Sequence, residues 1–117
     1  MSAWHGLVLA AAFMLTACDA ERKDECDRFL AAMKPVLADS PDRASIDRVK
    51  AAIAALQLQD KPLREYAAST KATLAVLSGT LEVQASPSAP DGTDALVKEK
   101  LKEARGEQND VARYCAQ

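Results

Sequence analysis

Residues 60–84 read DKPLREYAASTKATLAVLSGTLEVQ, and this stretch decides the fold. Its apolar and small side chains recur at alternating spacings of four and three, at Leu63, Ala67, Thr70, Leu74, Leu77 and Leu81. This spacing places them along one side of a helix, the pattern by which helices pack in coiled-coil-like bundles. Asp60, Lys61 and Pro62 indicate the start of the helix, because an acidic cap is followed by proline in the first turn. Gly79 costs about 1 kcal/mol relative to alanine inside a helix, so we expect the last turns to be loose.

A second long helix is predicted at the end of the chain. Residues 85–92 contain two prolines, a glycine and no bulky side chain, which indicates a loop. We expect Thr93 to cap the helix that follows. The same alternation of four and three then joins Val97, Leu101, Ala104, Gln108, Val111 and Cys115. The two long helices therefore present one apolar side each.

Two further helices are predicted before residue 60. Apolar side chains between Cys26 and Leu37 share one helical face, and we expect a helix at about 21–38 that kinks or ends early at Pro35. Ser40 is expected to cap the next helix, at about 41–58, with Pro41 in its first position. No run of alternating strand-forming residues appears. The sequence predicts an all-α domain, a small up-down antiparallel bundle of about four helices.

The N-terminal segment differs in character from the rest of the chain. Residues 6–17 are apolar or near-neutral, a run too short to span a membrane but long enough for the hydrophobic region of a secretory signal. Residues 1–5 contain no Lys or Arg, and every charged residue lies after Cys18. The run Leu15-Thr16-Ala17-Cys18 resembles the lipobox of bacterial lipoprotein precursors.

The resemblance implies that residues 1–17 are a lipoprotein signal peptide and 18–24 a lipidated tether, and the spacing of apolar residues places the helical domain at 25–117. The resemblance also implies that Cys18 is the lipidated residue and holds the protein to a membrane. The expected location is the bacterial cell envelope, facing the periplasm, with the inner membrane favoured over the outer because Asp19 follows the acceptor cysteine. Whether residues 19–24 are a polar tether or the first turn of a helix is left open.

Cys26 and Cys115 lie on the apolar faces of the first and last predicted helices. In an up-down bundle of four helices these positions are at the same end, and an extracytoplasmic location favours oxidation. We expect a disulfide between them, and two buried free thiols are the alternative. No metal site is expected, because the residues after Cys18 contain no His and no third thiol.

Two charged clusters are interpreted as solvated surface. Near the first helix start the acidic residues Asp24, Glu25 and Asp27 are mixed with the basic residues Arg22, Lys23 and Arg28, which argues against a shaped calcium loop. Three basic residues share one face of the last helix: Lys98, Lys102 and Arg105. They are candidates for contact with anionic lipid head groups, but a solvent face with pairs such as Asp94–Lys98 is favoured.

The functional prediction depends mainly on what the chain lacks. The 15 basic and 17 acidic residues give a net charge of −2, which argues against nucleic-acid binding. Without a histidine after Cys18 there is no Ser–His or Cys–His arrangement, so neither catalysis nor a cofactor is expected. The sequence favours a membrane-anchored, non-catalytic protein-interaction or structural module that binds an unknown envelope protein. The alternative is a carrier that binds a small apolar ligand between the helices.

Overall fold

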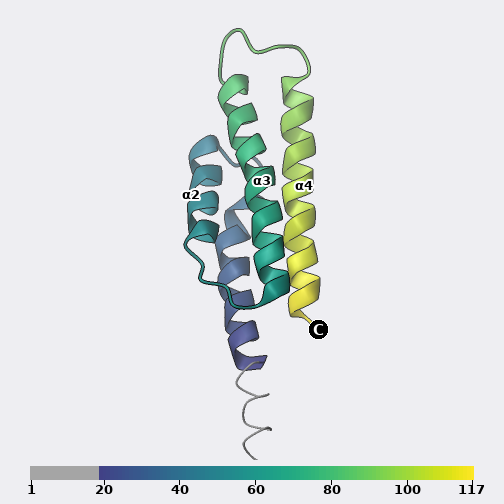
Figure 1. Cartoon of the computed structure of the whole chain (residues 1–117). Coiled ribbons are helices and arrows are strands. Elements are labelled where there is room, and N and C mark those ends of the chain that lie inside the picture. The colour runs from purple at the N-terminus through teal and green to yellow at the C-terminus, as the bar shows by residue number, and fades with distance from the viewer. Residues whose placement is uncertain (1–18) are drawn as a thin grey trace, which may run out of the picture.

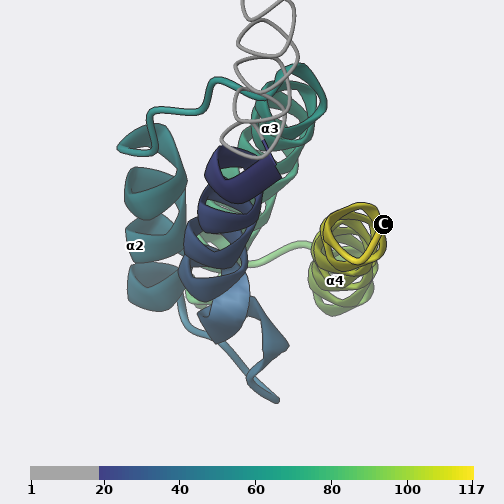
Figure 2. The same cartoon turned by 90° about the horizontal axis from the view of Figure 1, so that it is seen from below.

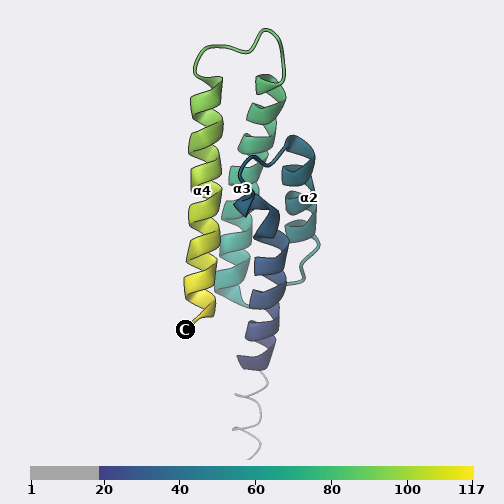
Figure 3. The same cartoon turned by 180° about the vertical axis from the view of Figure 1, so that it is seen from behind.

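A computed structural model describes residues 19–117 and confirms the predicted all-α bundle (Figure 1). The first helix covers residues 19–33 and continues into the 3-10 helix η1, Lys34–Leu37; α2 spans Arg43–Ala54, α3 Lys61–Gln84 and α4 Thr93–Cys115. The helices run alternately up and down, with the start of the first helix and the end of α4 at one end (Figures 1 and 3). Among these helices, none is long and apolar enough to cross a membrane.

The end view shows how α3 is placed relative to the other helices (Figure 2). α2 and α4 lie on opposite sides of the first helix, and α3 packs against both α2 and α4. The upper turns of α3 and α4 project beyond α2 and η1 (Figures 1 and 3). One long side of α3 therefore faces away from the other described helices.

The predicted caps are right for α3 and wrong for the two helices on either side of it in the chain. Asp60 caps α3, since its Oδ2 accepts a hydrogen bond from the Leu63 N–H at 3.2 Å. α2 is capped by Asp42 rather than Ser40, with the Ser45 N–H donating to the Asp42 Oδ1 at 2.8 Å. This hydrogen bond from the Ser45 backbone lowers the pKa of the Asp42 carboxyl below its ordinary value. Carboxylates compete well with hydroxyls at this position because they favour the positive end of the helix dipole.

The cap of α4 is a glycine rather than the predicted Thr93. Gly92 has φ 90°, in the left-handed region that glycine tolerates. The Thr93 hydroxyl donates to the Pro90 carbonyl at 2.7 Å, so it stabilises the preceding loop instead of the first turn. Sequence reasoning selected the better side-chain cap and missed the backbone turn that places the helix start.

The first helix ends where Pro35 prevents it from continuing. The α-helical hydrogen bonds stop at Met33, and the chain tightens into η1, in which the Ala38 N–H donates to the Pro35 carbonyl at 3.2 Å. The early end was one of the two outcomes predicted for this proline. Val36 in η1 is fully buried, so the 3-10 turn still contributes to the core.

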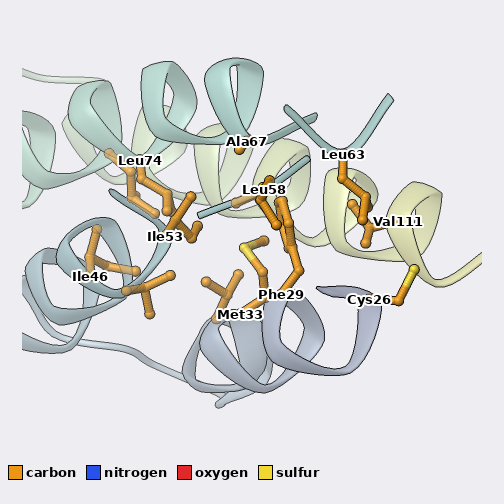
Figure 4. Packing of buried hydrophobic residues seen from close by; sticks show 14 of the residues in the cluster. Cys26, Phe29, Met33, Ile46, Ile53, Leu58, Leu63, Ala67, Leu74 and Val111 are labelled. Carbon is orange, nitrogen blue, oxygen red and sulfur yellow. The ribbon is translucent and has the colours of Figure 1, made fainter. Parts of the chain in front are cut away.

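The core joins all the helices, and most of its residues come from the apolar helix faces predicted from the sequence, which we call seams (Figure 4). Its buried apolar residues are Cys26, Phe29, Met33, Val36, Ile46, Val49, Ile53, Leu58, Leu63, Ala67, Leu74, Leu77, Leu101, Ala104 and Val111. On α3, Leu63, Thr70 and Leu74 are fully buried, as the spacing predicted, whereas Leu81 is partly buried. Gly79 does not interrupt α3, which continues to Gln84.

Residues 55–59 do not form the predicted end of α2. The helix stops at Ala54 rather than near residue 58, and Leu58 reaches the core from a segment without regular secondary structure. The carboxylate of Glu25 accepts a hydrogen bond from the Gln59 N–H, so a side chain of the first helix satisfies the backbone of this connection. A donor paired in this way does not need a helical partner.

Cys26 and Cys115 are joined by a disulfide, with their Cα atoms 5.8 Å apart. The bridge links the first helix to the last turn of α4 across 89 residues of sequence. This pairing confirms the prediction that both cysteines lie at the same end of the bundle.

Reducing this bridge should lower the unfolding free energy by about 4 kcal/mol, because the unfolded chain regains the freedom of a long closed loop. For a domain of this size we expect the midpoint of thermal unfolding to fall by roughly 15–30 °C. Circular dichroism melts with and without reductant measure the change. The double variant Cys26→Ser/Cys115→Ser is the control and should not respond to reductant. An unchanged midpoint for the native chain on reduction would contradict this role.

Arg105 of α4 holds the end of η1 instead of pointing into solvent as predicted. Its Nε donates to the Val36 carbonyl at 3.2 Å, and its Nη2 donates to the Ala38 carbonyl at 2.6 Å. These carbonyls lie at the end of η1, where the helix supplies no further N–H groups. The Arg105 guanidinium therefore links the turn after Pro35 to α4.

The variant Arg105→Ala should lower the unfolding free energy by about 1–3 kcal/mol, since the part-buried bond to the Val36 carbonyl and the exposed bond to the Ala38 carbonyl both lose a charged donor. The exposed Lys102 of the same helix provides the control, and Lys102→Ala should change the unfolding free energy by less than about 0.5 kcal/mol. Urea denaturation of both variants distinguishes the two. Equal effects would show that Arg105 contributes no more than an ordinary surface residue.

Candidate functional site

The lipid acceptor predicted from the sequence, Cys18, lies outside the described residues. The chain is already helical at Asp19, so residues 19–24 form the first turns of the helix rather than an extended tether. Of the two interpretations left open for this segment, the helical one is correct. This helix begins at the end of the bundle where α4 finishes (Figure 1).

A polar network surrounds the disulfide at that end. The Tyr114 hydroxyl donates to the Asp60 Oδ2 at 2.7 Å, and the Tyr114 ring lies 6.0 Å from the Tyr66 ring between centroids. The Arg22 guanidinium lies 5.7 Å from the Tyr114 centroid, and its Nη2 donates to the Gln117 carbonyl at 2.9 Å. These contacts tie the first helix, the start of α3 and the end of α4 together.

The acidic cluster near the first helix start is only partly the solvated surface predicted. Asp24 pairs with Arg28 at 3.1 Å on the exposed side of the helix. Glu25 is 4% exposed and accepts the hydrogen bond from Gln59, so it supports the connection between α2 and α3. Within residues 19–117, no three His, Cys, Asp or Glu side chains converge as metal ligands.

The upper half of α3 has an exposed apolar surface. Val76 and Val83 of α3 and Leu96 of α4 are 48%, 44% and 39% exposed. They line a hollow of about 450 Å³ that also includes Ala75, Gly79, Thr80 and residues 90–93. Exposed apolar side chains that gather in this way are typical of protein contacts.

The apolar surface continues down the side of α3 that faces away from the bundle. We call this side the α3 outer face, defined by Ala68, Ala72, Ala75, Val76, Gly79 and Val83, all of which are exposed. None of these six residues is charged. Lys71 and Glu82 lie at the edge of the face, and Asp91 lines the hollow beside its upper half. The side of a helix farthest from the core normally carries its most polar residues, so this face is unusual.

Sequence reasoning missed the α3 outer face although its signal is readable. Ala72, Val76, Gly79 and Val83 follow spacings of four, three and four, the same alternation as the buried seam. The large leucines of the buried seam give the stronger hydrophobic signal, so the parallel row of smaller residues was not identified as a second seam. α3 thus has one helix-packing seam used inside the bundle and a second that no described residue covers.

Gly79 has no packing reason within the domain. A Cβ built at Gly79 meets no atom within 4 Å, and α3 continues past it to Gln84. A glycine at such a position costs about 1 kcal/mol relative to alanine. Its benefit is that another backbone can approach α3 closely at the middle of the outer face.

A second hollow, of about 390 Å³, lies on the other side of the projecting α3–α4 hairpin. Leu81, Val97 and Leu101 form its apolar floor, and residues 39–41 form part of its rim. The expected Asp94–Lys98 pair is replaced there by a hydrogen bond from the Gln84 Nε2 to the Asp94 Oδ1 at 2.8 Å. This hollow lies between α3, α4 and the connection that precedes α2.

Comparison with known proteins finds no protein-family model, no curated protein and no solved structure that matches this chain.

The Tyr114–Asp60 contact makes stability depend on pH in the alkaline range. Burial, together with the hydrogen bond to Asp60, raises the pKa of the Tyr114 hydroxyl above its ordinary value of 10.0. The unfolded chain therefore releases this proton at a lower pH than the folded chain. It follows that the unfolding free energy falls as pH rises from the unfolded pKa through the folded one.

The variant Tyr114→Phe removes this proton and should flatten the decline in stability above about pH 9. Near neutral pH the variant should be less stable by about 1 kcal/mol, because the hydrogen bond to Asp60 is lost. Urea denaturation of both proteins between about pH 8 and pH 11 measures the two slopes. Identical slopes would rule out a shifted Tyr114 as their cause.

Proposed function

We propose that this protein is a lipid-anchored module of the bacterial cell envelope that binds another protein through the α3 outer face and performs no catalysis. The anchor would be Cys18, on the basis of its resemblance to the lipobox acceptor. The location facing the periplasm agrees with a disulfide, which oxidising compartments favour. Asp19 favours the inner membrane.

The arrangement of the two ends supports this proposal. An anchor at Cys18 would adjoin a chain that is helical from Asp19, so little slack would separate the lipid from the bundle. α3 begins at Lys61, at that same end of the bundle. Val76 and Val83 lie about 22 and 33 Å along α3 from Lys61. The outer face is thus displaced from the anchored end, where an envelope partner can reach it.

The observation that carries the proposal is the exposure of Val76, Val83 and Leu96 on one hollowed surface. An apolar surface in water is stabilised when a partner covers it, at about 25 cal/mol for each Å² removed from water. Holding such a surface at a membrane raises its effective concentration near membrane partners, so a small interface suffices. The core side chains are packed at near-zero exposure, which favours this function over a carrier.

Intact mass spectrometry of membrane-extracted protein tests the anchor. The expected mass is that of a chain beginning at Cys18 with acyl groups attached. A second variant, secreted with a conventional signal peptide and without the acceptor cysteine, should fold and keep the Cys26–Cys115 bridge. It should not restore wild-type behaviour to cells that lack the protein. An unmodified Cys18, or full rescue by the untethered variant, would overturn the proposal.

A matched pair of surface variants tests the face itself. Val76→Asp places a charge on the outer face, whereas Ala51→Asp places one on the exposed side of α2. Both should change the unfolding free energy by less than about 1 kcal/mol, since both sites are exposed. Only Val76→Asp should abolish function in cells that express the lipidated chain. Loss of function in both, or in neither, would count against this use of the outer face.

A further inference from the structure

The α3 outer face changes in side-chain size from one end to the other. The lower half presents the small side chains Ala68 and Ala72, and the upper half presents Val76 and Val83. Leu96 of α4 adds a further large side chain beside the upper half. A helix that fits this face must therefore be bulky opposite Ala68 and Ala72 and small opposite Val83.

A second copy of α3 meets this requirement when it runs in the opposite direction. A two-fold axis between Val76 and Leu77 would place Val83 of each copy between Ala68 and Ala72 of the other. Gly79 would then lie near Ala75 and Val76 of the second copy, and the missing side chain would let the two backbones approach to about 8 Å. Large side chains fill the spaces left by small ones, as packing in helix seams requires.

The charges at the edge of the outer face obey the same symmetry. Lys71 and Glu82 lie on one edge, eleven residues apart, and the midpoint between them coincides with the proposed axis. The antiparallel pair therefore brings Lys71 of each copy to Glu82 of the other, so that the attraction occurs twice. Within residues 19–117, Lys71 forms no ion pair. Glu82 already pairs with Arg43 of α2 at 3.3 Å, but its side chain is 62% exposed, so Lys71 of the second copy would join that pair.

A parallel pair lacks both kinds of complementarity. It would place Val83 against Val83 and Ala72 against Ala72, which separates the helices at one end and leaves a gap at the other. It would also keep Lys71 and Glu82 apart by the rise of eleven residues, about 16 Å, which exceeds the Debye length at physiological salt. The side-chain sizes and the charges therefore select the same direction independently.

We infer that the partner of the α3 outer face is a second copy of this chain, packed antiparallel about a two-fold axis between Val76 and Leu77. The inference rests on the proposed function for its use of this face and names the occupant. The two Cys18 anchors then lie at opposite ends of the dimer. Both can enter one bilayer when the two-fold axis is perpendicular to the membrane and the helices lie along its surface.

Cysteine cross-linking of the purified, lipidated protein in detergent tests the direction. Ala75→Cys lies near the axis and should form a disulfide-linked dimer alone. Ala72→Cys and Val83→Cys should not link to themselves, but a mixture of the two variants should give a mixed dimer. Ala51→Cys, on the exposed side of α2, is the matched control and should remain monomeric. Self-linking of Val83→Cys, or equal linking of Ala51→Cys, would overturn the antiparallel arrangement.

Variants at the glycines distinguish the interface from the fold. Gly79→Leu should raise the dimer dissociation constant at least about tenfold, because the backbones can no longer approach. Gly106→Leu on α4, where a Cβ also meets no atom within 4 Å, should leave the dissociation constant unchanged. Both variants should melt at or above the native temperature, since leucine favours helix over glycine. Sedimentation equilibrium measures the constants, and an equal effect of the two variants would exclude Gly79 from the interface.

A charge exchange provides the third test. Lys71→Glu should raise the dissociation constant about three- to thirty-fold, because the symmetric dimer contains the ion pair twice. The double variant Lys71→Glu/Glu82→Lys should bind more tightly than Lys71→Glu alone, although it also removes the pair between Glu82 and Arg43, while Lys102→Glu should have no effect.

A chain that remains monomeric at all concentrations would overturn this inference. If the same cysteines then linked to a different protein in cells, the proposed function would stand and only its occupant would be wrong. Failure to link to any protein at the outer face would contradict both.

Discussion

The structure depends on the buried seam of α3, because the other elements are assembled against it. Leu63, Leu74 and Leu77 are buried along one side of this helix. α2 packs on one flank and α4 on the other, with η1 bridging between α2 and α4. The core is short of large side chains for a domain of this size, so fixed connections supplement it. The disulfide, the Glu25 contact with Gln59 and the Arg105 contacts with η1 each join segments that are distant in sequence.

These connections leave α3 with an uncovered side. A helix buried on one side usually exposes its most charged residues on the opposite side. In α3 that side presents alanine, valine and glycine over about four turns, from Ala68 to Val83. The alanines favour the helix itself, but exposed valines and a mid-helix glycine do not stabilise an isolated bundle. The contact that we propose outside the single chain would account for these residues.

Much of the fold was predictable from the sequence, because seams with heptad spacing and Pro35 act locally. The antiparallel order and the Cys26–Cys115 pairing followed from those seams. Errors arose where distant residues decide local structure. α2 ends early because Glu25 supports the backbone at Gln59, and Arg105 is held by carbonyls that follow Pro35. The choice between Ser40 and Asp42 as cap depended on backbone angles that composition does not reveal. The α3 outer face was readable, but only the structure shows that none of the described helices covers it.

The central claim is that the α3 outer face is covered by protein in the living cell. A photo-reactive amino acid placed at Val76 or at Ala51, in cells that express the full chain, tests it most directly. Both positions are exposed in the single chain, so a difference in cross-linking between them reflects contact with another protein. Our account predicts a discrete cross-linked protein species at Val76 after illumination, twice the mass of the chain if the occupant is a second copy, and none at Ala51. Equal labelling at both positions, or none at Val76, would contradict the claim.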